Sequence, residues 1–140
     1  MSVLVVDASV AAKWFLDEVH SNESRRLLGP GYELHAPDFI LLELDNVFCQ
    51  RTRRGDLAEQ DAESARALLQ AAPLQLHAFL GLRDVAYQIA CQLGRSVYDS
   101  LYAALAQSLR CRMATADRRF RNALGGHEMA DLLLWVEDIL

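Results

Sequence analysis

One stretch decides the fold of this chain: VLVVDAS, which occupies residues 3–9. Its first four residues are all apolar, and such a short continuous run is typical of a parallel strand that is buried on both faces. A carboxylate, Asp7, stands where this strand ends, and the hydroxyl of Ser9 follows two residues later. Ligands of open α/β sheets bind at the carboxyl ends of the strands, so Asp7 is a candidate ligand-binding residue.

Length and composition indicate a single domain over residues 1–140. The chain has 140 residues, of which 52% are hydrophobic, and this is enough for one folded core. No apolar run approaches the roughly 20 residues that span a bilayer, and the N-terminus lacks the pattern of a signal peptide. We therefore expect a cytoplasmic protein without a membrane association.

The spacing of the cysteines and histidines and the net charge exclude some classes of function. The three cysteines, Cys49, Cys91 and Cys111, form no C-x-x-C pair, so we expect them to be small buried apolar residues. The histidines show no zinc-binding spacing. A net charge of −5 argues against non-specific coating of nucleic acid. Local arginine clusters near a carboxylate pocket are nevertheless compatible with phosphate binding.

Strands alternate with helices along the chain. We expect strands at residues 3–6, 32–36, 74–77, 112–115 and 132–136, with a terminal helix as the alternative for the last. We expect helices at residues 10–16, 21–28, 37–54, 59–71, 82–93, 99–109 and 117–124, with Ser9 as the N-cap of the first. This alternation predicts an α/β fold with a parallel sheet and helices on both of its faces.

Glu43 is a second carboxylate that breaks the pattern of its element. In the helix expected around it, Phe39 and Val47 lie four residues to either side on one apolar stripe. Glu43 is therefore drawn toward the interior, where a carboxylate needs a partner or a metal. Asn46, one turn on, could share the site, whereas Asp45 lies on a polar face and should be solvated.

Asp99 and Asp117 complete the set. Asp99 lies at the start of a helix, with helix capping as the alternative role. Asp117 follows a strand and Thr115, which repeats the pattern of Asp7 and Ser9, although a turn aspartate is the alternative. A parallel sheet brings these positions to one edge, where crowded carboxylates repel unless a cation neutralises them. Oxygen ligands favour Mg²⁺ or Mn²⁺, ions that serve phosphate chemistry.

Four motifs in this order carry a family resemblance: VLVVDAS with Asp7, LLELDN with Glu43, VYDS with Asp99 and ATAD with Asp117. Over residues 2 to about 124 the chain resembles the PIN-domain nucleases, and among them the VapC-type toxins of toxin–antitoxin pairs. The resemblance implies a three-layer α/β/α sandwich around a parallel sheet. It also implies a Mg²⁺- or Mn²⁺-dependent endoribonuclease, in which a metal-activated water hydrolyses the phosphodiester and leaves 5′-phosphate and 3′-hydroxyl ends.

The same resemblance implies the roles of individual residues and the partners. The family's catalytic acids fall on Asp7, Glu43, Asp99 and Asp117. Asp7 and Asp99 are the first choices for direct metal ligands, while Glu43 and Asp117 ligate directly or through water. Supporting positions fall on Ser9, Asn46 and Thr115. Arg118 and Arg119 are candidates for RNA phosphate contacts, with a solvated or salt-bridged role as the alternative. The implied partners are RNA, a cognate protein antitoxin and a second copy of the chain in a homodimer.

Three other readings compete with a nuclease. A phosphatase of the haloacid-dehalogenase type requires a second aspartate at the position of Ser9 and a lysine late in the chain, and this chain has neither. A response-regulator receiver requires paired acids after the first strand and a lysine near its end, which are also missing. The remaining alternative is a catalytically silent PIN-fold module that only binds its antitoxin partner.

Overall fold

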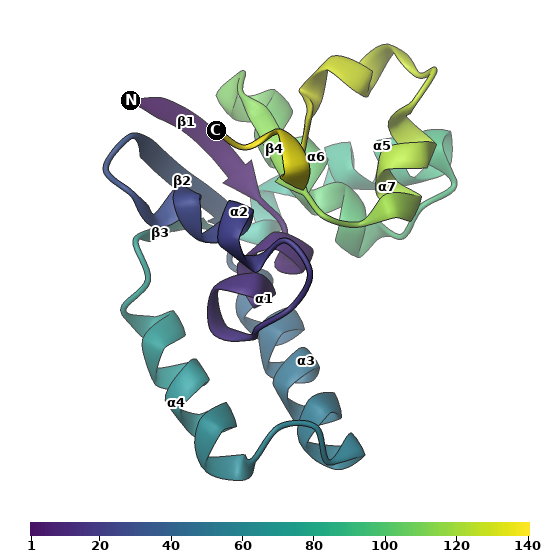
Figure 1. The fold of residues 1–140 in the computed structure, drawn as a ribbon. Coiled ribbons are helices and arrows are strands. Elements are labelled where there is room, and N and C mark those ends of the chain that lie inside the picture. The colour runs from purple at the N-terminus through teal and green to yellow at the C-terminus, as the bar shows by residue number, and fades with distance from the viewer.

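A five-stranded, fully parallel sheet runs through the centre of the molecule (Figure 1). The computed structural model describes all residues 1–140. Its strands are β1 (Ser2–Val6), β2 (Tyr32–Pro37), β3 (Leu74–His77), β4 (Arg112–Thr115) and β5 (Leu133–Trp135). Their order across the sheet is β3-β2-β1-β4-β5, and each neighbouring pair is parallel. The predicted terminal strand is confirmed as β5.

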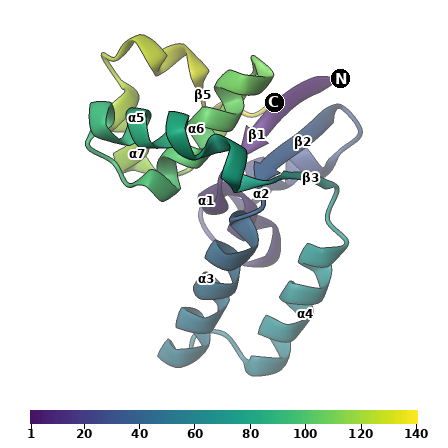
Figure 2. The same cartoon turned by 180° about the vertical axis from the view of Figure 1, so that it is seen from behind.

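Seven helices surround this sheet. They are α1 (Ala8–Phe15), α2 (Ser21–Arg25), α3 (Ile40–Arg54), α4 (Glu59–Gln70), α5 (Arg83–Leu93), α6 (Val97–Leu109) and α7 (Arg118–Leu124), with short 3-10 turns η1 (Arg26–Leu28), η2 (Phe79–Leu82), η3 (Glu128–Leu132) and η4 (Val136–Asp138). Helices α1 and α2 lie on one face and α5 and α6 on the other, which confirms the α/β/α sandwich (Figures 1 and 2). The α3–α4 hairpin projects away from the sheet. No helix has both the length and the apolar character of a membrane span.

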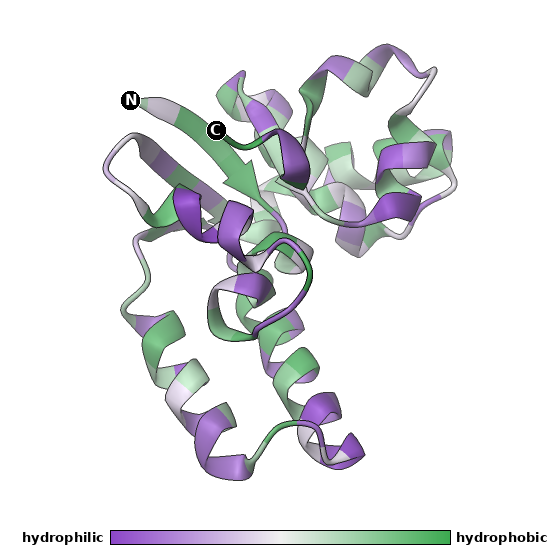
Figure 3. Ribbon diagram, viewed as in Figure 1, coloured by the Kyte–Doolittle hydropathy of each residue, from purple (hydrophilic) through white to green (hydrophobic).

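The core explains why β1 decides the fold. Val5 and Val6 are completely buried, as expected for a central strand covered on both faces. Helix α6 lies against the sheet with a run of small residues, and Ala103, Ala104 and Ala106 are at most 2% exposed. Small side chains let the helix backbone approach the strands closely. Figure 3 shows the same division, with β1 apolar along most of its length and the far end of α3 hydrophilic.

The order of the strands fixes where a site can form. From β1 the chain moves outward to β2 and β3, and it later returns to the other side of β1 to form β4 and β5. The direction of winding therefore changes between β1 and β4, and crevices for ligands open at such points, outside the carboxyl ends of the strands. Asp7 ends β1 and Asp117 follows β4, so both acids lie at this crevice.

Two predicted helix starts are wrong. The first helix begins at Ala8, and its N-cap is Asp7 rather than Ser9, because the Asp7 carboxylate accepts the Val10 N–H. Helix α3 begins at Ile40 instead of residue 37. Pro37 still belongs to β2, and the Asp38 carboxylate accepts the Phe79 N–H at 3.1 Å, which ties this segment to η2.

The predicted burial of the cysteines is also wrong. Cys49 and Cys91 are exposed and Cys111 is partly exposed. The first two lie within α3 and α5, while Cys111 occupies the turn between α6 and β4. Asp45 is not simply solvated either, because it accepts a hydrogen bond from Arg66 of α4 at 2.8 Å.

Candidate active site

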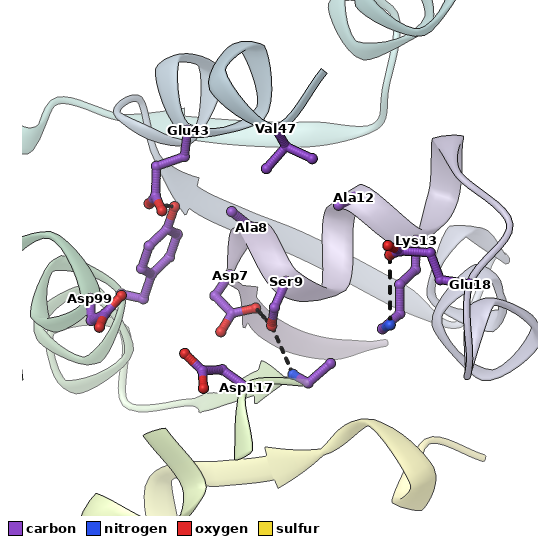
Figure 4. A pocket seen from close by; sticks show the side chains of 12 residues that line it. Asp7, Ala8, Ser9, Ala12, Lys13, Glu18, Glu43, Val47, Asp99 and Asp117 are labelled. Atoms are coloured by element: carbon purple, nitrogen blue, oxygen red, sulfur yellow. Dashed lines mark hydrogen bonds and ion pairs between the residues drawn. The ribbon is translucent and has the colours of Figure 1, made fainter. Parts of the chain in front are cut away.

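A cavity of about 360 Å³ lies at the carboxyl ends of β1 and β4 (Figure 4). All four predicted acids line it, although they are separated by up to 110 residues of sequence (117 − 7). Asp7 and Asp117 enter from the strand ends, Glu43 from α3 and Asp99 from the first turn of α6. The complete lining is Asp7, Ala8, Ser9, Ala12, Lys13, Glu18, Glu43, Val47, Asp99, Tyr102, Ala116 and Asp117.

The Asp7 side chain is held by three hydrogen bonds. Its Oδ1 accepts from Ser9 Oγ at 2.6 Å and from the Val10 N–H at 3.1 Å. Its Oδ2 accepts from Thr115 Oγ1 at 2.5 Å. Each carboxylate oxygen has two acceptor positions, so Oδ1 is fully used and Oδ2 keeps one position free. Asp7 can therefore offer one oxygen to a ligand without losing any of its present hydrogen bonds.

Two hydroxyl groups connect β1 with the loop after β4. Ser9 Oγ donates to Asp7 and accepts from the Ala116 N–H at 2.9 Å. Thr115 Oγ1 donates to Asp7 and accepts from the Asp117 N–H at 3.1 Å. The repeated pattern of a hydroxyl two residues from an aspartate thus builds one network, which fixes the positions of both aspartates relative to each other.

Burial makes the ionised form of Asp7 unfavourable. Asp7 is only 7% exposed, and this burial raises the pKa of its carboxyl group to about 6. Hydrogen bonds from Ser9, Thr115 and Val10 oppose the rise, while the nearby charge of Asp117 adds to it. A carboxylate with a strongly raised pKa in a cavity is typical of a functional site.

Burial also makes the ionised form of Glu43 unfavourable. The hydroxyl of Tyr102, itself 2% exposed, donates to Glu43 Oε1 at 2.5 Å. Burial raises the pKa of the Glu43 carboxyl to about 7, the Tyr102 hydrogen bond opposes this rise, and the charges of Asp7 and Asp99 increase it. Burial and the Glu43 charge in turn raise the pKa of Tyr102 well above its ordinary value. The sequence patterns place Tyr102 on the face of Asp99 but do not indicate this role.

The other two acids share an arginine that the sequence patterns do not single out. Arg95 Nη2 donates to Asp99 Oδ2 at 2.8 Å and to Asp117 Oδ2 at 3.2 Å. Asp117 Oδ1 accepts from the Arg119 and Phe120 N–H groups, so Asp117 is also the N-cap of α7. The only sequence signal for Arg95 is its position four residues before Asp99, the spacing at which opposite charges pair on a helix.

A basic group lies at the opposite end of the cavity. Lys13 Nζ is 3.7 Å from Glu18 Oε1, and Arg51 of α3 pairs with the other oxygen of Glu18.

Arg118 and Arg119 are exposed at the start of α7, beside Asp117. Asn46 is exposed on α3 and is not part of the cavity lining, so its role in the site stays a prediction.

The donor set of the cavity fits a hard divalent ion. Its candidate ligand atoms are carboxylate oxygens, and no histidine or cysteine lines the cavity. Oxygen donors favour Mg²⁺ or Mn²⁺ over zinc. In the observed side-chain arrangement no three acids converge on one point. Tyr102 holds Glu43, and Arg95 holds Asp99 and Asp117, so these hydrogen bonds occupy oxygens that an ion would use. Asp7, Glu43, Asp99 and Asp117 each keep at least one free acceptor position.

Comparison with known proteins identifies the family. The PIN domain matches residues 4–124, so the chain belongs to the PIN-domain family. Within that family it groups with the VapC ribonucleases: it is 32% identical over 118 residues to ribonuclease VapC3 of Pyrobaculum aerophilum, covering 83% of this chain and 90% of the relative.

Solved structures support the same fold. Mycobacterium tuberculosis VapC20, a toxin that cleaves the sarcin–ricin loop, superposes with a TM-score of 0.68 at 16% identity, covering 86% of this chain and 94% of VapC20. VapBC2 of Rickettsia felis, solved with a DNA fragment from its promoter, gives a TM-score of 0.66 at 12% identity, covering 95% of this chain and 98% of the other.

Proposed function

We propose that the protein is the toxin component of a toxin–antitoxin pair and acts as a Mg²⁺- or Mn²⁺-dependent endoribonuclease. One observation carries the proposal: the PIN fold brings Asp7, Glu43, Asp99 and Asp117 to one cavity at the point where the sheet changes direction. Buried carboxylates with raised pKa values require either protons or a cation, and a divalent ion suits their oxygen atoms. RNA is the substrate that the VapC ribonuclease relatives support. We place this activity in the cytoplasm, where RNA is found.

A bound ion supplies an activated water and stabilises the charge of the phosphate in the transition state. Asp7 contributes the free position of Oδ2, which its hydrogen bonds aim into the cavity. Glu43 can accept the proton of the attacking water on Oε2, because Oε1 is engaged by Tyr102 and Oε2 has no hydrogen-bond donor. Arg118 and Arg119 contact the RNA backbone beside Asp117, where arginines pair well with phosphates.

We also propose two protein partners. A solved toxin–antitoxin complex from Klebsiella pneumoniae has a similar fold, with a TM-score of 0.59 at 11% identity, and it supports a cognate antitoxin for this chain. A homodimer is supported by large apolar side chains exposed around η2 and the start of α6, since such groups often mark protein interfaces. They are Phe79, Leu80 and Tyr98, which are 43%, 67% and 59% exposed.

Purified protein incubated with total RNA tests the proposed activity. We expect cleavage with Mg²⁺ or Mn²⁺ and none with a chelator. Asp99→Asn should abolish cleavage, because the amide loses the charge that an ion requires. The matched control is Asp84→Asn, which makes the same change in the first turn of α5 at an exposed position. A folded parent that cuts no RNA with either ion, yet binds its antitoxin tightly, would establish the silent interaction module instead.

Thr115→Val tests whether the hydroxyl network positions Asp7. Valine matches threonine in shape but removes the donor to Asp7 and the acceptor of the Asp117 N–H. We expect RNA cleavage to fall about 10- to 100-fold, as is usual when a group that orients a metal ligand is lost. Thr52→Val is the matched control, because the Thr52 hydroxyl only donates to the Phe48 carbonyl on α3. Equal cleavage rates for the two variants would show that Thr115 does not position Asp7.

A further inference from the structure

Arg95 joins two of the four acids through a single atom. It lies in the turn between α5 and α6, directly after Gly94, which ends α5 with a φ of +67°. Its Nη2 donates to Asp99 Oδ2 at 2.8 Å and to Asp117 Oδ2 at 3.2 Å. A terminal guanidinium nitrogen carries two N–H groups, so each is used on a different carboxylate. One positive group thus bridges α6 and the start of α7.

The rest of the Arg95 side chain is held in place. It is 21% exposed, and its guanidinium carbon lies 6.0 Å from the ring centroid of buried Phe120, within the range of a cation–π contact. Its Nε is buried without a hydrogen-bond partner. An unpaired buried donor is unfavourable, and two charge-assisted hydrogen bonds can offset this cost. Arg95 is therefore fixed next to Asp99 and Asp117, two of the acids that line the cavity.

The charge balance of the cavity argues against two divalent ions beside this arginine. The ionised acids carry four negative charges, while Arg95 and one divalent ion together supply three positive charges. A second ion between Asp99 and Asp117 would use the oxygens that Arg95 already occupies. It would also place a double positive charge next to the guanidinium and make the net charge of the cavity positive.

We propose that Arg95 takes the place of a second metal ion, bridging Asp99 and Asp117 so that the site holds one divalent ion. This inference rests on the proposed metal-dependent function and deepens it. Asp7 and the free Oδ1 of Asp99 would hold the single ion, with Glu43 beside them to accept the proton of the attacking water. Arg95 is a positioning residue: it holds Asp99 Oδ2 and Asp117 Oδ2 away from the ion and neutralises part of the charge of both carboxylates.

Titration of the metal-free protein with Mn²⁺ by calorimetry tests the proposal. We expect the parent to bind one ion and Arg95→Gln to bind two, because glutamine frees both carboxylates and removes the charge. Arg95→Lys keeps a cation and should bind one. Arg83→Gln is the matched control: it removes one arginine charge at an exposed position at the start of α5 and should bind one ion. Electron paramagnetic resonance gives a second readout, an isolated Mn²⁺ in the parent and a spin-coupled pair in Arg95→Gln.

Two bound ions in the parent would overturn the role of Arg95 while leaving the proposed function standing. A folded Arg95→Gln that still binds one ion would also overturn it. If Arg95→Gln does not fold, the parent spectrum and Arg95→Lys decide, since a spin-coupled pair in the parent contradicts the proposal. A parent that binds no Mn²⁺ at all would overturn both this inference and the proposed metal dependence.

Discussion

Asp7→Asn is expected to reduce RNA cleavage at least about a thousand-fold, which corresponds to roughly 4 kcal/mol of lost transition-state stabilisation. The amide keeps the size of the side chain and can still accept the Ser9 and Val10 hydrogen bonds on its remaining oxygen. It removes the charge that would hold a divalent ion. Because asparagine is as good an N-cap as aspartate, α1 should form normally.

The matched control for this variant is Asp61→Asn, which makes the same change at an exposed position of α4, away from the cavity. It should cleave RNA at the rate of the parent. Circular dichroism of both variants should match the parent, so that loss of activity cannot be attributed to unfolding. If Asp7→Asn cuts RNA as fast and at the same positions as the parent, the metal-site hypothesis is wrong and a contaminating nuclease is responsible.

The stability of the metal-free protein should depend on pH through Asp7. Folding raises the pKa of this carboxyl from 3.8 to about 6, so the folded state binds its proton more tightly than the unfolded state. The corresponding stability is fully present below about pH 4 and is lost as the pH rises through about 6. Because one pKa unit corresponds to about 1.4 kcal/mol, the loss for Asp7 is roughly 3 kcal/mol. Glu43, whose pKa is raised to about 7, adds a loss of the same sign.

Urea unfolding of the parent and of Asp7→Asn, in chelator and across this pH range, measures the effect. The difference between the two isolates Asp7, because the remaining carboxylates contribute to both. We expect Asp7→Asn to gain stability relative to the parent as the pH rises. Mg²⁺ should stabilise the parent more at about pH 8 than at about pH 5, since protons compete with the ion for the carboxylates. Parallel pH profiles for the two proteins would contradict the raised pKa.

Local patterns were sufficient for much of the fold and for the candidate acids. An apolar run of strand length with a carboxylate at its end identifies β1 and Asp7 without any tertiary information. The places of Glu43, Asp99 and Asp117 follow because parallel strands and the helices after them share an edge of the sheet. These predictions depend only on periodicity and on the geometry of parallel sheets.

Features that depend on three-dimensional packing could not be read in the same way. Arg95 is one of thirteen arginines, and only the fold shows that the turn after α5 points it at Asp117 as well as at Asp99. The hydrophobic character of cysteine suggests burial, but only the fold shows that Cys49 and Cys91 are exposed on their helices. Serine and aspartate are equally good N-caps, so composition does not choose between Ser9 and Asp7, and the backbone of the folded chain places Asp7 at the N-cap of α1.

Asp7 divides its work between its two oxygens. Oδ1 accepts from Ser9 and closes the first turn of α1, while Oδ2 accepts only from Thr115 and keeps one acceptor position free for a ligand. Substitution by alanine would remove both the N-cap of α1 and the candidate ligand oxygen, so any change in activity would be mixed with a loss of helix stability. Substitution by asparagine keeps the N-cap and removes only the negative charge. Asp7→Asn should therefore give an intact but inactive form of the protein. Such a form would be useful for trapping bound RNA or for expressing the toxin safely.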